Sequence, residues 1–456
     1  MLLTRPLPVL SAPAATRGGH RVFAVVLAVA ALLRVVMMLA YDTAQVYWYD
    51  SFTYMDNALH LRPPGAFHPA GYSAFLWFFR DVRVVAGVQH ALGLGIGLLI
   101  YALLRRKGLP GWGAALATVP VLFNPAFLRL EHAVLSETLL ILLIVGAVTA
   151  LMWEERPSPR LAAAAGLLIA CAALTRTAAA PLLGLLVLFL LVRRAGPRPV
   201  VALTLAGALP LLAYAGWFAQ HHGRFALSGS DGIALWARTM TFADCSVIEP
   251  SPVIKGLCPN GTVVDAASEY VWAPGASLNR LGGDRFQYNA LAREFAVKAI
   301  LAQPFDYLRD VASDASLAFT LTPVAHPKRV VPALGYPVGS WGLPEEHALI
   351  GQVRRSYDPG IKGLSSVQPW VSVLNAVPYP WLLHGPLFGI MLLVGVRRVS
   401  LPWLASVFLF LGPIAALDFD HRYLLPAIPL ACVAAALAIR PLCRDLRRLR
   451  GALRGR

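Results

Sequence analysis

The chain alternates long apolar runs with short polar or basic turns. Runs such as 22–41 and 179–192 approach the roughly 20 residues that a helix needs to cross the hydrocarbon core of a bilayer. The pattern predicts an all-α polytopic membrane protein with about ten transmembrane helices. We place these predicted spans at 22–41, 84–104, 111–128, 138–153, 161–175, 179–192, 200–218, 377–396, 401–417 and 423–439.

Composition supports this prediction. Hydrophobic residues make up 57% of the 456 residues and charged residues only 14%, against about 25% charged in ordinary soluble domains. A soluble fold is therefore excluded.

The formal net charge of +16 follows the predicted turns. Basic residues gather at 105–107, 193–198 and 397–398 and in the C-terminal tail. Because basic residues stay on the cytoplasmic side of membranes, this pattern places both termini in the cytoplasm. Aromatic residues do not alternate with the arginines of the tail, so the charge indicates orientation and contact with anionic lipids, not nucleic-acid binding.

The spans divide the chain into four parts. Residues 1–219 form an N-terminal membrane module of about seven spans, whose first outer loop, 42–83, has the pattern of an interfacial helix pair. Residues 220–376 form a large extracytoplasmic insert with an expected amphipathic helix at 288–302. Residues 377–440 hold the C-terminal transmembrane helices, and 441–456 form a basic cytoplasmic tail.

Two of the five cysteines favour a disulfide. Cys171 and Cys432 fall in apolar runs and Cys443 in the tail, which leaves Cys245 and Cys258 together in the polar insert. A disulfide between them requires an oxidising compartment, as the predicted topology provides.

Ionisable residues from distant segments share the outer face in this topology. Such groups are costly near a membrane and are usually retained for function. Sugar transfer from a lipid phosphate needs a carboxylate to take the acceptor proton, cations for the leaving phosphate and an apolar groove for the lipid. The residues in question are Asp50, Asp56, His60, His68, Glu131, His132, Glu137, Arg176, Asp418, Asp420, His421 and Arg422.

Several short motifs, taken in order, resemble one family. Tyr49-Asp50-Ser51-Phe52-Thr53-Tyr54 and His68-Pro69-Ala70-Gly71-Tyr72 in the first loop look like the acidic first-loop signature of the GT-C superfamily of membrane glycosyltransferases. Three further stretches recur in similar order in bacterial members that use lipid-phosphate sugars: Leu135-Ser136-Glu137-Thr138, Leu174-Thr175-Arg176 and Asp420-His421-Arg422-Tyr423. The resemblance covers most of the membrane part and not the insert.

The resemblance implies roles for these residues. Asp50 would be the general base of an inverting transfer, and Glu137 a second acid that orients the acceptor or binds a metal. Arg176 and Arg422 would face the donor phosphate. His68 and His421 are further phosphate candidates, and Tyr54, Glu131, His132 and Asp420 are candidates for the acceptor or for a secondary role.

A divalent cation, Mg²⁺ or Mn²⁺, is compatible with these carboxylates, although Ser51 stands where family members more often carry a second acid. The simpler interpretations are a solvated loop aspartate for Asp50, a turn histidine for His68, interface anchors for Arg176 and Arg422, and pairing of Asp420 with a neighbouring His421 or Arg422.

The expected partners are a polyprenyl-phosphate sugar donor, membrane lipids and a glycan, lipid or protein acceptor of the cell envelope. Alanine, arginine and leucine usage is typical of a GC-rich bacterial genome, so we expect the bacterial inner membrane with an extracytoplasmic active site. A flippase or transporter would instead place its ionisable groups near the midplane. A surface-glycan polymerase or ligase would share both the topology and the chemistry.

Overall fold

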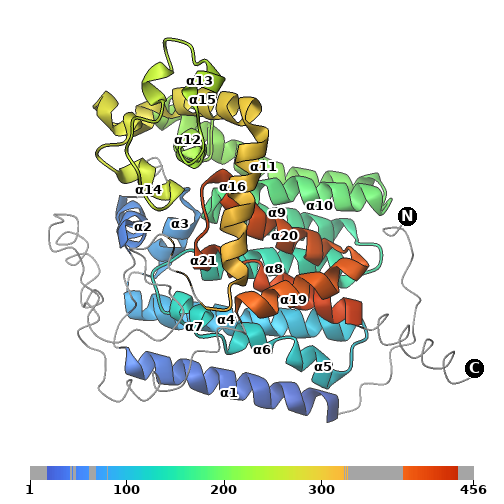
Figure 1. Cartoon of the computed structure of the whole chain (residues 1–456). Coiled ribbons are helices and arrows are strands. Elements are labelled where there is room, and N and C mark those ends of the chain that lie inside the picture. Colours follow the sequence, from blue (N-terminus) through green and yellow to red (C-terminus); the bar gives the residue numbers. More distant parts are fainter. Residues whose placement is uncertain are drawn as a thin grey trace, which may run out of the picture.

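The computed structural model describes residues 18–41, 44, 48–60, 68–79, 81–322, 324, 326 and 384–439, and every regular element in these ranges is a helix (Figure 1). The predicted tail, the C-terminal part of the insert and the start of the span at 377–396 lie outside the described residues. The N-terminal module contains α1 (Gly18–Ala40), α2 (Trp48–His60), α3 (Gly71–Phe78), α4 (Val82–Arg106), α5 (Gly111–Leu116), α6 (Val119–Leu122), α7 (Pro125–Glu131), α8 (Glu137–Trp153), α9 (Pro159–Thr175), η1 (Thr177–Ala179), α10 (Ala180–Val192) and α11 (Pro197–His222).

Four described helices are long and apolar enough to cross a bilayer, namely α1, α4, α11 and the helix His421–Ile439, which begins with α21 (His421–Leu424). The segments Gly111–Leu122 and Pro125–Glu131 add a fifth crossing if the pair, bent by 63°, is one span. The chain is thus a multi-pass membrane protein. Helices also lie on the remaining predicted spans, but α8, α9, α10 and α20 (Leu401–Ala416) are only 13–17 residues long, so the count of ten stays a prediction.

The helices pack closely where small residues meet. A Cβ added to Gly166 of α9 would lie 2.3 Å from the Leu203 carbonyl oxygen of α11, so only glycine permits this approach. α1 and α11 leave most of their apolar surface exposed, whereas the helix from His421 is 78% buried in its most apolar window. The helix from His421 is therefore central among the described helices, and α1 and α11 present apolar surface that suits contact with lipid.

The basic turns gather at one end of the bundle. Arg106 donates to the Trp153 carbonyl at 3.3 Å, and Arg193 donates to the Glu155 carbonyl at 3.3 Å, which joins the ends of α4, α8 and α10. α2 and α3 lie at the other end of these helices (Figure 1). This arrangement separates the arginine-rich turns from the first loop, as the positive-inside pattern predicts.

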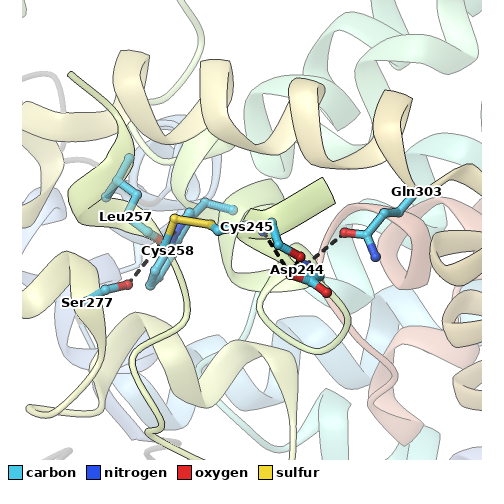
Figure 2. The surroundings of a disulfide bond; sticks show 8 residues. Asp244, Cys245, Leu257, Cys258, Ser277 and Gln303 are labelled. Carbon is cyan, nitrogen blue, oxygen red and sulfur yellow. Dashed lines mark hydrogen bonds between the residues drawn. A yellow bond between two sulfur atoms is a disulfide. The ribbon is translucent and has the colours of Figure 1, made fainter. Parts of the chain in front are cut away.

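The insert folds around α12 and α15. Trp236 on α12 is fully buried, and its indole N–H donates to the Leu257 carbonyl at 3.0 Å. Nearby, Cys245 and Cys258 are joined by a disulfide (Figure 2). The elements are α12 (Asp231–Thr239), α13 (Cys245–Ile248), η2 (Lys255–Leu257), α14 (Ala267–Trp272), η3 (Ser277–Leu281), η4 (Arg285–Tyr288), α15 (Asn289–Ala302), α16 (Pro304–Ser316) and η5 (Leu317–Phe319).

A buried arginine fixes the insert to the membrane part. Arg238 of α12 is fully buried and pairs with Asp310, at 2.8 Å, and with Asp314, both on α16. One of its guanidinium nitrogens also lies 3.5 Å from the Leu417 carbonyl oxygen, just after α20.

The described C-terminal elements are α19 (Gly385–Gly395), η8 (Val396–Arg398), α20 and the helix His421–Ile439.

Candidate active site

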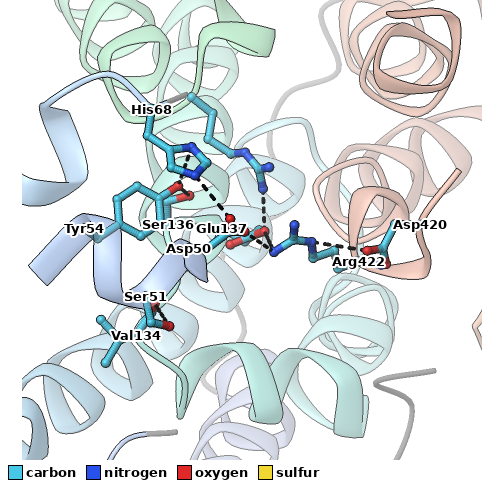
Figure 3. Close-up of polar contacts among 10 residues, drawn as sticks. Asp50, Ser51, Tyr54, His68, Val134, Ser136, Glu137, Asp420 and Arg422 are labelled. Carbon is cyan, nitrogen blue, oxygen red and sulfur yellow. Dashed lines mark hydrogen bonds and ion pairs between the residues drawn. The ribbon is translucent and has the colours of Figure 1, made fainter. Parts of the chain in front are cut away.

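Asp50, in the first turn of α2, lies within a cluster of charged residues that come from four distant segments (Figure 3). A hydrogen bond from the Ser51 hydroxyl to the Val134 carbonyl, 2.8 Å long, ties α2 to the stretch before α8. That stretch ends at Ser136, directly before Glu137 begins α8, so the bond brings the first loop and the start of α8 together.

Asp50 is held by two partners. Its Oδ2 lies 2.8 Å from a terminal guanidinium nitrogen of Arg422, and its Oδ1 lies 3.2 Å from Nε2 of His68. Burial would raise the pKa of the Asp50 carboxyl, but the charge of Arg422 and the hydrogen bond from His68 outweigh it and lower that pKa below its usual range. Asp50 is therefore a carboxylate at neutral pH, and its side chain is still 23% exposed.

Glu137 joins the two arginines. Its Oε1 accepts a 2.5 Å hydrogen bond from Arg176, and Arg422 approaches the same oxygen at 3.6 Å. The ring of Tyr423 lies 5.3 Å from each guanidinium, close enough for cation–π attraction. The Glu137 side chain is 1% exposed and that of Arg176 is 18% exposed, so the arginine is the part of this pair that a ligand can reach.

Tyr54 and His68 form a second set of polar contacts that leads to Asp50. The Tyr54 hydroxyl lies 3.0 Å from the Ser136 hydroxyl and 3.3 Å from Nδ1 of His68. Because the opposite ring nitrogen of His68 faces Asp50, the imidazole is oriented from both sides. Ser136, Tyr54 and His68 thus form a chain of polar contacts that ends at the Asp50 carboxylate.

Asp420 contacts Arg422 through both its backbone and its side chain. Its carboxylate accepts from the Arg422 backbone N–H at 2.9 Å as the N-cap of α21, and it lies 3.4 Å from Nε of Arg422. Pairing of Asp420 with its neighbour is what the simpler interpretation of the sequence predicts.

The described residues do not fit a divalent metal at this site. No group of three or more His, Cys, Asp or Glu side chains in the described ranges is arranged to hold an ion. Each carboxylate of the cluster faces an arginine, and Mg²⁺ or Mn²⁺ would require oxygen ligands in those positions.

Glu131 and His132 lie in a separate buried network. Glu131 is 1% exposed and binds Arg34 of α1 at 2.7 Å and Nδ1 of His90 at 2.9 Å, while Nε2 of His90 lies 3.0 Å from His132. Gly93 of α4 leaves room for the Glu131 carboxylate, since a Cβ added at Gly93 would lie 1.9 Å from Glu131 Oε1. The structure does not bring these two candidates to Asp50, because this network directs them into the helix bundle.

His421 also points away from the cluster. Its Nε2 donates to the Val324 carbonyl at 2.7 Å, and its ring faces Phe419 and His384. Asp418, two residues before α21, accepts from the Ser268 N–H of the insert at 2.9 Å. Burial raises the pKa of Asp418 to about 6, with the Ser268 hydrogen bond opposing the rise.

Two buried contacts are not predicted from the sequence. Tyr423 stands there only as part of a motif, although its ring lies against both arginines of the cluster. His90 lies within the apolar run of α4 and pairs with Glu131 and His132. An ionisable side chain inside an apolar run indicates a buried partner, so the sequence does contain a signal for this residue.

No protein-family model matches the chain, and no curated protein sequence matches it. Among solved structures, an archaeal oligosaccharyltransferase AglB from Archaeoglobus fulgidus, in complex with an inhibitory peptide and a dolichol-phosphate, is 15% identical with a TM-score of 0.43 over 97% of this chain and 52% of that one. A second Archaeoglobus fulgidus oligosaccharyltransferase structure is 14% identical with a TM-score of 0.40, covering 92% of this chain and 49% of that one.

The protein O-mannosyltransferase Pmt1-Pmt2 complex of S. cerevisiae, bound to the sugar donor, is 13% identical with a TM-score of 0.37, covering 57% of this chain and 41% of that one. All three structures are sugar-transferring enzymes, the class that the sequence motifs resemble. The chain spans about half the length of the oligosaccharyltransferases and 41% of the mannosyltransferase chain.

Proposed function

We propose that this protein is a membrane glycosyltransferase that moves a sugar from a polyprenyl-phosphate donor to an acceptor hydroxyl on the extracytoplasmic side, with inversion. The observation that carries the proposal is the meeting of Asp50, Glu137, Arg176 and Arg422 at the end of the bundle opposite the arginine-rich turns. A reachable carboxylate beside two guanidinium groups is the set of charges that such a transfer needs.

In this mechanism the acceptor oxygen attacks the anomeric carbon while the bond from that carbon to the phosphate oxygen breaks. The acceptor proton passes to Asp50, and the leaving polyprenyl phosphate gains a negative charge beside Arg176. Among the described residues the Arg176 guanidinium gives one hydrogen bond, to Glu137, which leaves further N–H donors of its planar fork for phosphate oxygens. The lipid tail lies along the apolar helices.

Donor binding would also activate the base. In the ligand-free protein Arg422 lowers the pKa of Asp50, which makes the carboxylate a weak proton acceptor. A donor phosphate competes for Arg422, and any weakening of the Arg422–Asp50 pair returns basicity to Asp50. The chemical step is thereby linked to the presence of the donor.

A transporter or flippase is the main competitor. The structure does contain ionisable groups deep among helices, namely Arg34, His90, Glu131 and His132. These groups are buried and pair with one another, as a structural network does, whereas Asp50 and Arg176 of the cluster are partly exposed. This distribution favours the enzyme.

The experiment is the replacement of Asp50 by Asn in the purified full-length protein. Asn keeps the shape and removes the base, so transfer from a panel of polyprenyl-phosphate sugars should fall about 100-fold to 10,000-fold. Donor binding should be kept or strengthened, because Arg176 and Arg422 contact the phosphate and Arg422 no longer pairs with a charged Asp50. Both quantities are measured on one preparation, by product formation and by equilibrium binding.

Asp56→Asn is the matched control, since Asp56 lies on the same helix and pairs locally with His60. It should keep full activity. Turnover of the Asp50→Asn protein near that of the unaltered protein would reject Asp50 as the base and make Glu137 the next candidate.

A further inference from the structure

α16 lies crosswise to the apolar helices of the bundle and runs from the insert toward α19 (Figure 1). Near its start, the Tyr307 hydroxyl donates to the Ala415 carbonyl in the last turn of α20, at 3.0 Å. Directly after α16, the ring of Phe319 packs near those of Phe388 of α19 and Phe410 of α20, with centroid distances of 6.2 and 5.5 Å. α16 thus crosses α19 and α20 away from the arginine-rich turn that joins them.

One face of α16 is bound to the rest of the protein. Asp310 and Asp314 on this face pair with the buried Arg238 of the insert. Val311 packs partly buried against the apolar core of the bundle, and Ala315 is buried. These contacts fix the rotation of α16 about its own axis, so the direction in which its remaining side chains point is fixed as well.

The opposite side of α16 is exposed and carries two rows of different character. The apolar row is Phe305, Leu308 and Ala312, of which Phe305 is 84% and Leu308 58% exposed. The polar row is Asp306, Arg309, Ser313 and Ser316, all of them exposed. Because each helical residue turns by about 100°, the apolar row covers an arc of about 60° and the polar row a neighbouring arc of about 80°. The apolar row lies between the polar row and the protein-bound face.

The apolar row continues the exposed apolar surface of the bundle. Near the residues that Phe319 contacts, α19 exposes Ile390 and Leu393 by 57% and 73%, and α20 exposes Leu411 by 38%. An apolar arc beside a polar arc is the pattern of a helix that lies at the boundary between acyl chains and headgroups. A second protein is the weaker match, because three side chains cannot supply the roughly 800 Å² that a stable protein interface buries on each partner.

We propose that α16 lies in the surface of the bilayer, with its apolar row among phospholipid acyl chains and its polar row at the headgroups. The lipid contact anchors the insert, because Arg238 links α16 to α12. Arg238 also lies near the Leu417 carbonyl, and Asp418 accepts a hydrogen bond from the insert, so the anchored insert is held against the loop that leads to Arg422. This inference does not depend on the proposed sugar transfer.

Nitroxide labels on neighbouring residues of α16 test the proposal. The full-length protein, lacking Cys171, Cys432 and Cys443 but keeping the disulfide, is placed in nanodiscs of phosphatidylethanolamine and phosphatidylglycerol. Single cysteines for the label are introduced by the substitutions Phe305→Cys, Leu308→Cys, Ala312→Cys, Arg309→Cys and Ser313→Cys. Val263→Cys is the control for a label in water, because Val263 of the insert is 86% exposed. Electron paramagnetic resonance then measures how often each label collides with oxygen, which concentrates among acyl chains, and with a nickel chelate, which stays in water.

The ratio of oxygen to nickel collisions should change between adjacent residues. It should be severalfold higher at Leu308 than at Arg309 and at Ala312 than at Ser313, as expected when the apolar face lies about 5–10 Å into the boundary of the acyl chains. The ratio at Val263 should be low. Ratios at the apolar row equal to that at Val263 would place α16 in water and overturn the proposal. Few collisions with either reagent at Phe305 and Leu308 would show that protein covers the row, which would overturn it too.

A second measurement uses proteins without labels. Hydrogen–deuterium exchange of the α16 backbone in the same nanodiscs should be severalfold faster in Phe305→Ser/Leu308→Ser than in the unaltered protein, because the helix loses its lipid contact. Arg309→Ser/Ser313→Ala is the matched control, since it changes two exposed residues of the polar row, and it should exchange like the unaltered protein. Equal exchange in the two double variants would show that the apolar row does not hold α16, and the proposal would fail.

Discussion

At the scale of single residues, the two arginines of the cluster differ in their surroundings. Arg422 lies between Asp50, Asp420 and Glu137, whereas Arg176 pairs with Glu137 and is the more exposed of the two. We therefore expect Arg176 to make the first contact with a donor phosphate and Arg422 to couple that phosphate to Asp50.

Replacing Arg176 by Gln should weaken donor binding about tenfold to a hundredfold, the range for a hydrogen bond to a charged group. Arg176→Lys keeps the charge and the partner of buried Glu137 but loses the planar fork, so it should fold normally and bind with intermediate affinity. Arg106→Gln at the other end of the bundle is the control. Donor affinity that is the same in all three variants as in the unaltered protein would make Arg176 a simple interface anchor.

A second prediction concerns Gly93, whose Cα faces the Glu131 carboxylate. Gly93→Ala should force Glu131 away from Arg34 and His90, since the added Cβ would lie 1.9 Å from its oxygen. Overpacking of this kind costs about 1–3 kcal/mol, so the thermal unfolding midpoint should fall. Gly95→Ala on the same helix meets only a Leu142 methyl at 3.5 Å and should leave the midpoint unchanged. Equal midpoints in the two variants would argue against a rigid Glu131 network.

At the scale of elements, the start of the insert depends on the disulfide. Cys245 and Cys258 close a loop between α13 and η2, and Asp244 beside them is held by Gln303 at 2.8 Å (Figure 2). A disulfide across a loop of this length stabilises by about 3 kcal/mol in the chain-entropy model.

The double variant Cys245→Ser/Cys258→Ser should therefore open this loop more often. Lys255 lies exposed within it, so trypsin should cleave after Lys255 more than tenfold faster than in the unaltered protein under native conditions. Cys171→Ser, which removes a free cysteine, is the control. Equal cleavage rates in the two variants would show that the disulfide does not hold the loop.

At the scale of the whole molecule, topology decides whether the cluster can meet an extracytoplasmic substrate. In a protein lacking Cys171, Cys432 and Cys443, a cysteine at Val263 of the insert, which is 86% exposed, should react with a membrane-impermeant maleimide in intact cells. A cysteine at Arg194, in the turn after α10, should react only after permeabilisation. The reverse pattern would place the insert in the cytoplasm and remove the basis of the site assignment.

The sequence by itself determined the features that depend on local composition. Apolar length predicted where helices lie, basic turns predicted one common end, and elimination among five cysteines predicted the disulfide. Topology placed twelve ionisable residues on one membrane side without any distance, and the resemblance of the motifs singled out Asp50, Glu137, Arg176 and Arg422 among them.

Only the tertiary structure decided which of these residues meet. His421 and Arg422 are neighbours in sequence, but adjacent helical residues point about 100° apart, so only Arg422 reaches Asp50. Glu131 ends α7, which bends by 63° from the preceding helix, and the buried charge of Arg34 draws it inward. A buried charge must have a partner, because removing it from water is costly. The sequence does not show which residue that partner is, since packing in three dimensions brings distant positions together.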